Sequence, residues 1–215
     1  MKTIVSLLIK SVLLLILPFI FLIRGAVFLH DHYQSAPWLA IFGATFLTIV
    51  LLIIYLTIFY GKMTGRMGTS SVFKRRIFLT VILVLGFSLN GLFFMSNKNA
   101  KHNDVQKEFT SLHPILRLSI STILFLDKDL IVTDAKRHPE DYKKMGLRSK
   151  KHSLHYPQSN GYVHAVDIRT NGRSDMRNFL LKLYFKGMGL NTLRHVGIDD
   201  HLHVSLGSFD RRGAI

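Results

Sequence analysis

The chain has 215 residues, 48% of them hydrophobic, and its mean hydropathy is positive. Membrane-spanning segments are therefore expected. The chain contains no cysteine, which excludes disulfides and thiolate metal sites and leaves histidine and carboxylate side chains as the ligands for any metal. Its formal net charge of +15 suits anionic partners such as nucleic acid, lipid headgroups or acidic wall polymers, and charge alone does not choose among them.

The chain divides into two halves of different composition. Residues 1–96 hold eight Lys or Arg and one acid, whereas residues 97–215 hold twenty Lys or Arg, twelve Asp or Glu and nine of the eleven histidines. Three apolar runs, residues 3–23, 38–60 and 77–96, lie in the first half. Each is long enough to cross a bilayer as a helix. We therefore predict an all-α transmembrane region over residues 1–96.

The orientation of this region follows from its loops. The run 3–23 is interrupted by Lys10 alone, and it can be interpreted as a cleaved signal peptide or as a retained helix. Its length and the lack of a clean cleavage site favour the retained helix. The loop 61–76 carries five basic residues and no acid, so the positive-inside rule puts this loop and the amino terminus in the cytoplasm. Residues after 96 are then expected outside.

The second half predicts a small α+β domain with an antiparallel sheet over residues 105–206. Residues 97–104 are polar and indicate a linker, and residues 207–215 indicate a loose tail. Pro114 is expected to begin a second helix within the helical stretch 105–126. The remaining expected elements are strands over 129–133, 163–168, 192–196 and 201–206, the last two as a hairpin, and helices over 139–145 and 174–186.

The helix over residues 174–186 is amphipathic. Its apolar stripe consists of Met176, Phe179, Leu180, Leu183 and Tyr184. Ser174 is a natural N-cap and Gly187 a natural C-cap. We expect this stripe to pack into the core of the domain.

Histidines and an aspartate on two of the strands are candidates for chemistry. In the strand 201–206, His201 and His203 point to the same face, because side chains alternate along a strand. In the strand 163–168, Asp167 lies on the face opposite to His164. Two histidines and one aspartate that leave one coordination position open form a catalytic zinc set.

These residues resemble a known family. The segments Ser-Leu-His at 153–155 and Ala-Val-Asp-Ile at 165–168, with Gly161 between them, resemble the S-x-H-x-x-G-x-A-x-D signature. That signature belongs to the zinc D-alanyl-D-alanine carboxypeptidases and L-alanyl-D-glutamate endopeptidases of bacterial walls and phage endolysins, which are related to lysostaphin-type enzymes. The resemblance implies a zinc peptidase fold in which His155 and Asp167 bind zinc.

Other segments extend the resemblance. Residues 200–203, Asp-His-Leu-His, match a later element of the family, which implies His203 as the third zinc ligand and leaves Asp200 and His201 as alternative general bases. Residues 131–137 resemble a turn whose arginine holds the substrate or stabilises the oxyanion, which implies Arg137. Ser153 is expected to fix a ligand or its loop.

The sequence also departs from the family pattern. Eleven residues lie between His155 and Asp167, more than in the signature, so a loop insertion is expected here. His164 lies within this interval and is a rival ligand, although strand alternation turns it away from Asp167. The turn before Arg137 lacks the usual Ser-Gly, and the acid at Asp200 is often Glu in the carboxypeptidases.

Resemblance and orientation together predict a membrane-anchored zinc metallopeptidase of the bacterial inner membrane. It would hydrolyse peptide bonds in peptidoglycan stem peptides from the periplasmic or extracellular side, with the lipid bilayer as its other partner. One alternative keeps this fold in a catalytically degenerate wall-binding or regulatory protein. Another, a basic nucleic-acid-binding membrane protein, requires the opposite topology and a recognition motif, and no such motif is visible in the sequence. We therefore expect no nucleic-acid partner.

Overall fold

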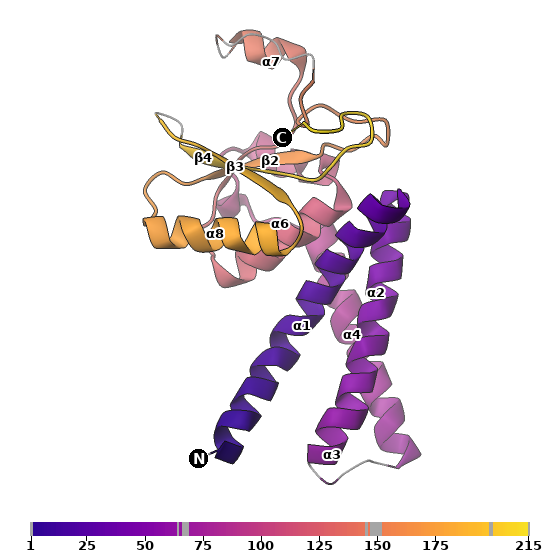
Figure 1. Ribbon diagram of the computed structural model, residues 1–215. Helices are drawn as coiled ribbons and strands as arrows, with labels where there is room; N and C mark the ends of the chain where they lie inside the picture. Colours follow the sequence, from indigo (N-terminus) through magenta and orange to yellow (C-terminus); the bar gives the residue numbers. More distant parts are fainter. Residues whose placement is uncertain are drawn as a thin grey trace.

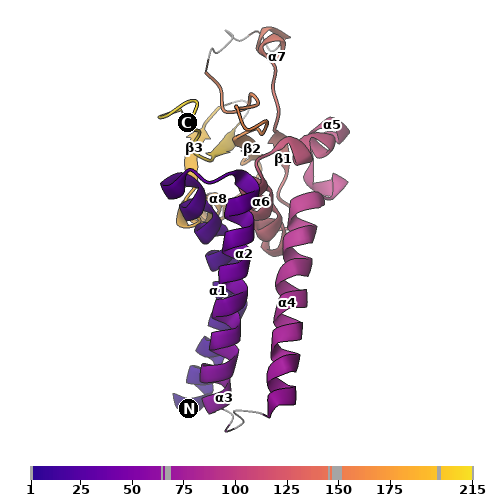
Figure 2. The same cartoon turned by 90° about the vertical axis from the view of Figure 1, so that its right-hand side faces the viewer.

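The computed structural model describes residues 2–63, 65, 69–144, 146, 152–197 and 200–214, with side chains for all of these except residues 2–5, 7–15, 59, 60 and 63. Long helices form the first half of the chain, and a mixed α+β unit on a four-stranded antiparallel sheet forms the second (Figures 1 and 2). Residues 97–214 are called the sheet unit below. The α+β class and the antiparallel sheet confirm the predictions.

The first half contains three long apolar helices. They are α1 (Lys2–Tyr33), α2 (Pro37–Ile54) and α4 (Ser70–Phe93). Helix α2 continues through a π-helical turn, Tyr55–Tyr60, into the short α3 (Gly61–Met63). The stretches Ile16–Tyr33, Pro37–Ile58 and Ser70–Phe93 are each long and apolar enough to cross a membrane, which confirms the three predicted apolar helices.

The helix boundaries differ from the predicted ones. Helix α1 extends to Tyr33 instead of ending near residue 23, because Ala26, Val27 and His30 are buried against neighbouring elements and tertiary packing prolongs the helix. Helix α4 begins at Ser70 instead of residue 77, so most of the described part of the basic loop 61–76 is helical. Residues 64 and 66–68 of that loop lie outside the described residues.

The sheet unit follows the predicted order of elements. Pro114 begins its main helix, whose N-cap is His113, with Nδ1 accepting the N–H of Ile115 at 3.3 Å. Residue 145, the expected end of the short helix, lies outside the described residues. The elements are α5 (Asn103–Lys107), α6 (Pro114–Leu126), β1 (Val132–Asp134), α7 (Pro139–Lys144), β2 (Ala165–Arg169), α8 (Asp175–Gly187), β3 (Asn191–His195) and β4 (His201–Ser205), with 3-10 turns at Asn97–Asn99 and Glu108–Ser111.

The sheet has two unlike faces. Its strand order is β1-β2-β4-β3, and Asp167 pairs with His203 across β2 and β4. On one face, Val166, Ile168, Leu202 and Val204 join a core cluster that also contains side chains of α6 and α8. Alternation along the strands therefore places Asp167 and His203 on the face that these two helices do not cover.

The predicted linker and tail are both packed, so the expectation of a loose tail is wrong. Asn99 donates both amide hydrogens to the carbonyls of Lys128 and Leu130 at 2.9 Å. Ser208 donates to Gln158, and Arg211 donates to the carbonyl of Ser153, both at 2.9 Å. These polar segments resemble surface chain in the sequence, but partners distant in the chain satisfy their hydrogen bonds.

The helices and the sheet unit share one core. Leu22 and Ile23 of α1, Leu92 of α4 and Ile115 of α6 belong to the same cluster of buried side chains. The Arg117 guanidinium also ties α6 to the carbonyl of Leu92 at 2.9 Å. The two halves are therefore a single packed body.

The predicted burial of the amphipathic stripe on α8 is wrong for four of its five residues. Met176, Phe179, Leu180 and Leu183 are exposed, and Tyr184 is half-buried. The side chains that face the core are instead Asn178, Leu181 and Phe185. Both sets follow helical spacing, so periodicity alone cannot say which of them faces the sheet.

Candidate metal centre

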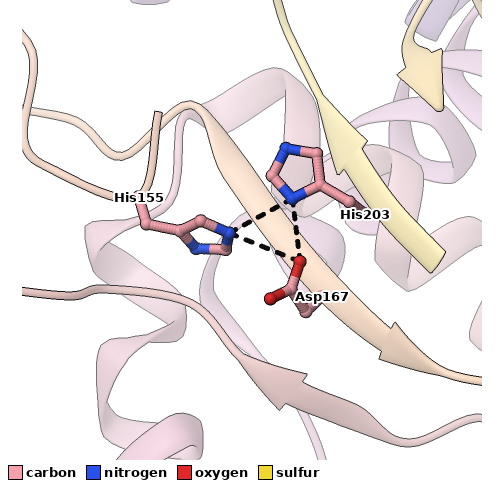
Figure 3. A group of neighbouring side chains, drawn as sticks. All are labelled: His155, Asp167 and His203. Carbon is pink, nitrogen blue, oxygen red and sulfur yellow. Dashed lines mark hydrogen bonds and ion pairs between the residues drawn. The ribbon is translucent and has the colours of Figure 1, made fainter. Parts of the chain in front are cut away.

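Three side chains converge on the uncovered face of the sheet (Figure 3). Oδ1 of Asp167 lies 2.8 Å from Nδ1 of His203 and 3.3 Å from Nε2 of His155. The two ring nitrogens lie 3.2 Å apart. Among the residues that the structure describes, only this group brings three His or acidic ligand atoms within 4.8 Å of one another. His155, Asp167 and His203 are called the metal group below.

The sheet and one loop position the metal group. Asp167 lies in the middle of β2 and His203 in the middle of β4, and the two are direct partners in the antiparallel register. His155 comes from the segment between α7 and β2. Its N–H donates to Oγ of Ser153 at 3.3 Å, and its carbonyl accepts the N–H of Arg137 at 3.0 Å. Ser153 therefore supports the loop that carries His155.

The loop insertion between His155 and β2 folds on itself. The N–H of Gln158 donates to the carbonyl of Tyr162 at 2.9 Å, and the N–H of Gly161 donates to the carbonyl of Gln158 at 2.8 Å. Gly161 has a φ of 78°, which only glycine adopts at low cost. The extra residues thus form a compact turn that leaves His155 facing Asp167.

The ring of His155 is oriented by a second hydrogen bond. Its Nδ1 lies 2.7 Å from the carbonyl oxygen of Ala135. A carbonyl only accepts, so Nδ1 carries the hydrogen. In the neutral ring, Nε2 then points its lone pair at Asp167 and His203. Histidines that bind metals are held in this way.

The Asp167 carboxylate is buried and anionic. Burial raises its pKa, but protonated His155, the hydrogen bonds from both histidines and the charge of Arg137 outweigh burial and hold the pKa well below its usual range. Without a cation, the histidine nitrogens that face this anion donate protons to it, and a metal ion can take the place of those protons.

Arg137 lies beside the metal group, and its guanidinium group is paired with two carboxylates. Nη2 of Arg137 lies 2.6 Å from Oδ2 of Asp167, and Nε lies 2.6 Å from Oδ2 of Asp134. Burial lowers the pKa of Arg137, but the two carboxylates outweigh burial and raise it, so the guanidinium stays charged. One oxygen of Asp167 thus faces the histidines and the other is fixed by Arg137.

The two candidate bases lie in different places. Nε2 of His201 is 3.7 Å from Oδ2 of Asp167, and its side chain is 25% exposed. The Asp200 carboxylate is instead bound by Arg194 at 2.8 Å and by Thr170 at 2.5 Å. The hydrogen bonds from Arg194 and Thr170 lower the pKa of Asp200 to about 2. The structure brings His201, and not Asp200, to the edge of the metal group.

The rival ligand His164 points elsewhere. Its Nδ1 donates to the carbonyl of Gly207 at 2.9 Å, and its Nε2 lies 2.9 Å from the Asn160 amide. Its ring packs against that of His113, with centroids 4.7 Å apart. Strand alternation had indicated this orientation.

Two residues at the site were missed by the sequence interpretation. Asp134 anchors Arg137, and its position three residues before the arginine was the available signal. Tyr142 hydrogen-bonds Oγ of Ser153 at 2.9 Å and lies beneath the Arg137 guanidinium. A tyrosine in a short helix carries no sequence signal for this contact, which depends on the fold of the whole segment.

The donor set fits zinc. Two imidazole nitrogens and one carboxylate oxygen are the three protein ligands of many catalytic zinc sites, which keep a fourth position for water or substrate. The partly exposed side chains of His201 and Arg137 border the group. Comparisons of the chain with protein-family models, with curated proteins and with solved structures find no match.

Proposed function

We propose that the protein is a membrane-anchored zinc metallopeptidase that hydrolyses peptide bonds in peptidoglycan stem peptides. The observation that carries the proposal is the convergence of His155, Asp167 and His203 on one face of the sheet. These three residues occupy the ligand positions implied by the resemblance to the D-alanyl-D-alanine carboxypeptidase and endopeptidase signature. The family resemblance suggests the substrate class, and the geometry of the three side chains supports a metal-binding site.

The charge distribution along the helices supports the proposed location. Lys62 and the basic residues at 74–76 lie near the turn between α3 and α4, at the end of the helices far from the sheet unit (Figure 2). The positive-inside rule puts that end in the cytoplasm. The sheet unit then lies on the outer side of the bacterial inner membrane, where the wall peptides are.

Each residue of the site has a proposed task. Nε2 of His155, Nδ1 of His203 and Oδ1 of Asp167 would hold the ion, which would supply Lewis acidity for water activation and carbonyl polarisation. Arg137 fixes the second oxygen of Asp167, and its charge favours the oxyanion that develops in the transition state. Nε2 of His201 takes the proton of the attacking water and passes it to the leaving amine.

The test uses the full-length protein in detergent, because the helices and the sheet unit share a core. Incubation with muropeptides, with and without a chelator, is followed by mass analysis. We expect release of D-alanine or a cut within the stem peptide that the chelator and His203→Ala both abolish. His102→Ala, which alters an exposed histidine, should leave the products unchanged.

Other outcomes are equally informative. Cleavage that survives both the chelator and His203→Ala would exclude the proposed zinc mechanism. Zinc and muropeptide binding without any cleavage would favour the wall-binding or regulatory alternative. The deep burial of all three ligand side chains is the feature of the structure that favours this alternative.

A further inference from the structure

Helix α8 carries large apolar side chains that the described parts of the chain leave uncovered. In order along the helix, Met176, Phe179, Leu180 and Leu183 are 66%, 60%, 53% and 55% exposed. Their spacing of i, i+3, i+4 and i+7 makes one stripe, called the α8 stripe below. Phe125 and Leu126 at the end of α6 are also exposed. A contiguous apolar patch of this kind marks a binding surface.

The direction of α8 is the first indication of its partner. Figure 1 shows α8 lying across the direction of α2, on the side of the sheet that faces the long helices. A helix that lies across membrane-spanning helices runs in the plane of the bilayer. An amphipathic helix in that plane buries its apolar face in the interface.

The level of α8 along the long helices is the second indication. A Cβ added to Gly189, just after α8, would collide with Arg24 and touch Val27 of α1. Gly25, which follows Arg24 in α1, faces Ala44 of α2. Ala44 lies seven residues past Pro37, the first residue of the apolar stretch. At the rise of an α-helix, and because Val27 lies two residues nearer that end than Gly25, this end of α8 lies about 7–10 Å inside the end of α2.

The exposed end of α6 gives an independent measure of depth. The rings of Phe125 and Phe87 of α4 lie 5.8 Å apart. Phe87 precedes Phe93, the last residue of α4, by six residues, or about 9 Å at the rise of a helix. Both measures thus reach a similar level, and interfacial helices bury their apolar faces to about 5–10 Å.

We propose that the α8 stripe inserts into the bilayer leaflet nearest the sheet unit. Lys182 and Lys186 on the same helix suit anionic headgroups. Asp127, at the end of α6, is paired with Arg173 and Arg177, which suits a weakly hydrated interface. This inference rests on the three apolar helices spanning the bilayer and is independent of the metal group.

The proposed insertion has a consequence for the site. Helices α6 and α8 cover one face of the sheet, and the metal group lies on the other. With α8 in the interface, the metal group faces away from the bilayer at a fixed height. The long helices then anchor the sheet unit, and the α8 stripe sets its orientation.

The absence of cysteine allows a site-specific test in the full-length chain. Leu183→Cys and, separately, Glu140→Cys on α7 are labelled with an environment-sensitive fluorophore. Each protein is placed, one chain per disc, in nanodiscs of phosphatidylethanolamine and phosphatidylglycerol, whose two faces are both open to solution. We expect the label at 183 to be protected from quenching by aqueous iodide and to be quenched by lipids that carry nitroxide on the acyl chain. The label at 140, an exposed position, should behave oppositely.

Two results would overturn the inference. One is quenching by iodide that is as strong at position 183 as at position 140. The other is protection from iodide without quenching by the nitroxide lipids, which would mean that protein covers the stripe. Met176→Cys repeats the measurement at the other end of the α8 stripe and guards against an effect of one label position.

Discussion

The protein contains two groups of buried histidines that differ in one respect. In the metal group, His155 and His203 converge on the carboxylate of Asp167. In the other group, the ring centroids of His30 and His164 each lie 4.7 Å from that of His113. All of these rings are buried. Only the metal group contains a buried acid, so the comparison shows what a buried carboxylate contributes to binding a cation.

The buried histidines of the second group serve as packing. Nδ1 of His30 and Nδ1 of His164 both donate to backbone carbonyls, those of Ser35 and Gly207. Burial lowers the pKa of His164 to about 4, despite an opposing hydrogen bond to Gly207. This second group joins α1, α6 and the start of β2. Burial alone is therefore a poor sign of a ligand, and the shared carboxylate is the better one.

The largest expected effect separates the two groups by zinc-dependent stability. Zinc at about 1,000 times its Kd should stabilise the wild type by about 4 kcal/mol. His203→Ala should abolish this gain, whereas His113→Ala should lower the basal stability and keep the gain. Thermal unfolding in detergent, with zinc or chelator, measures both. A zinc-dependent gain that survives His203→Ala and disappears in His113→Ala would reverse the assignment.

The next largest effect distinguishes His201 from Asp200 as the general base. Loss of a general base lowers turnover by about 10²- to 10⁴-fold, so His201→Ala should reduce kcat on muropeptides by that factor at unchanged zinc content. Asp200→Asn should reduce kcat much less, because the Asp200 carboxylate is held by Arg194 and Thr170. The opposite ranking of the two variants would restore Asp200 as the base.

A smaller effect tests the support of His155. Ser153→Ala removes the hydroxyl that accepts the N–H of His155, and loss of such support typically weakens metal binding by about 10-fold or more. Tyr142→Phe removes the hydrogen bond to the same hydroxyl and should weaken zinc binding in the same direction. Competition with a chromophoric chelator gives the affinities. Unchanged zinc affinity in both variants would limit Ser153 and Tyr142 to packing.

The smallest effect concerns acid and the second group. Burial lowers the pKa of His164 to about 4 in the folded protein, whereas an exposed histidine of the unfolded chain has its ordinary pKa of 6.5. Below pH 6.5 the unfolded chain therefore binds a proton that the folded chain does not, and stability is lost as the pH falls toward 4. At pH 5.5 the loss is about 1 kcal/mol. Unfolding of the chelator-treated protein between pH 7.5 and 5.5 measures this loss, and His164→Gln should reduce it. An equal loss in this variant would exclude His164 as the source.

The sequence predicts those features that alternation and turn residues determine. Asp167 and His203 could each be assigned to one face of a strand, because their apolar neighbours must be buried and side chains alternate between the two faces. The orientation of His164 followed from the same rule. The α+β class and the three apolar helices could be predicted because the length and periodicity of apolar runs are local properties of the sequence.

Features that depend on tertiary packing could not be predicted. The length of α1 depends on the burial of Ala26 and His30 against other elements. The exposed side of α8 depends on which of two helical faces meets the sheet. The orientation of the His155 ring by the carbonyl of Ala135, twenty residues away, depends on how a long loop closes. None of these contacts is local in the sequence.

The metal group is tested most directly by X-ray absorption at the zinc edge of the full-length protein. We expect one zinc per chain, with two imidazole nitrogens and one carboxylate oxygen at about 2.0–2.2 Å, and loss of this signal in His203→Ala. A chain that binds no zinc, or a zinc bound by three imidazoles without a carboxylate, would contradict the assignment to His155, Asp167 and His203.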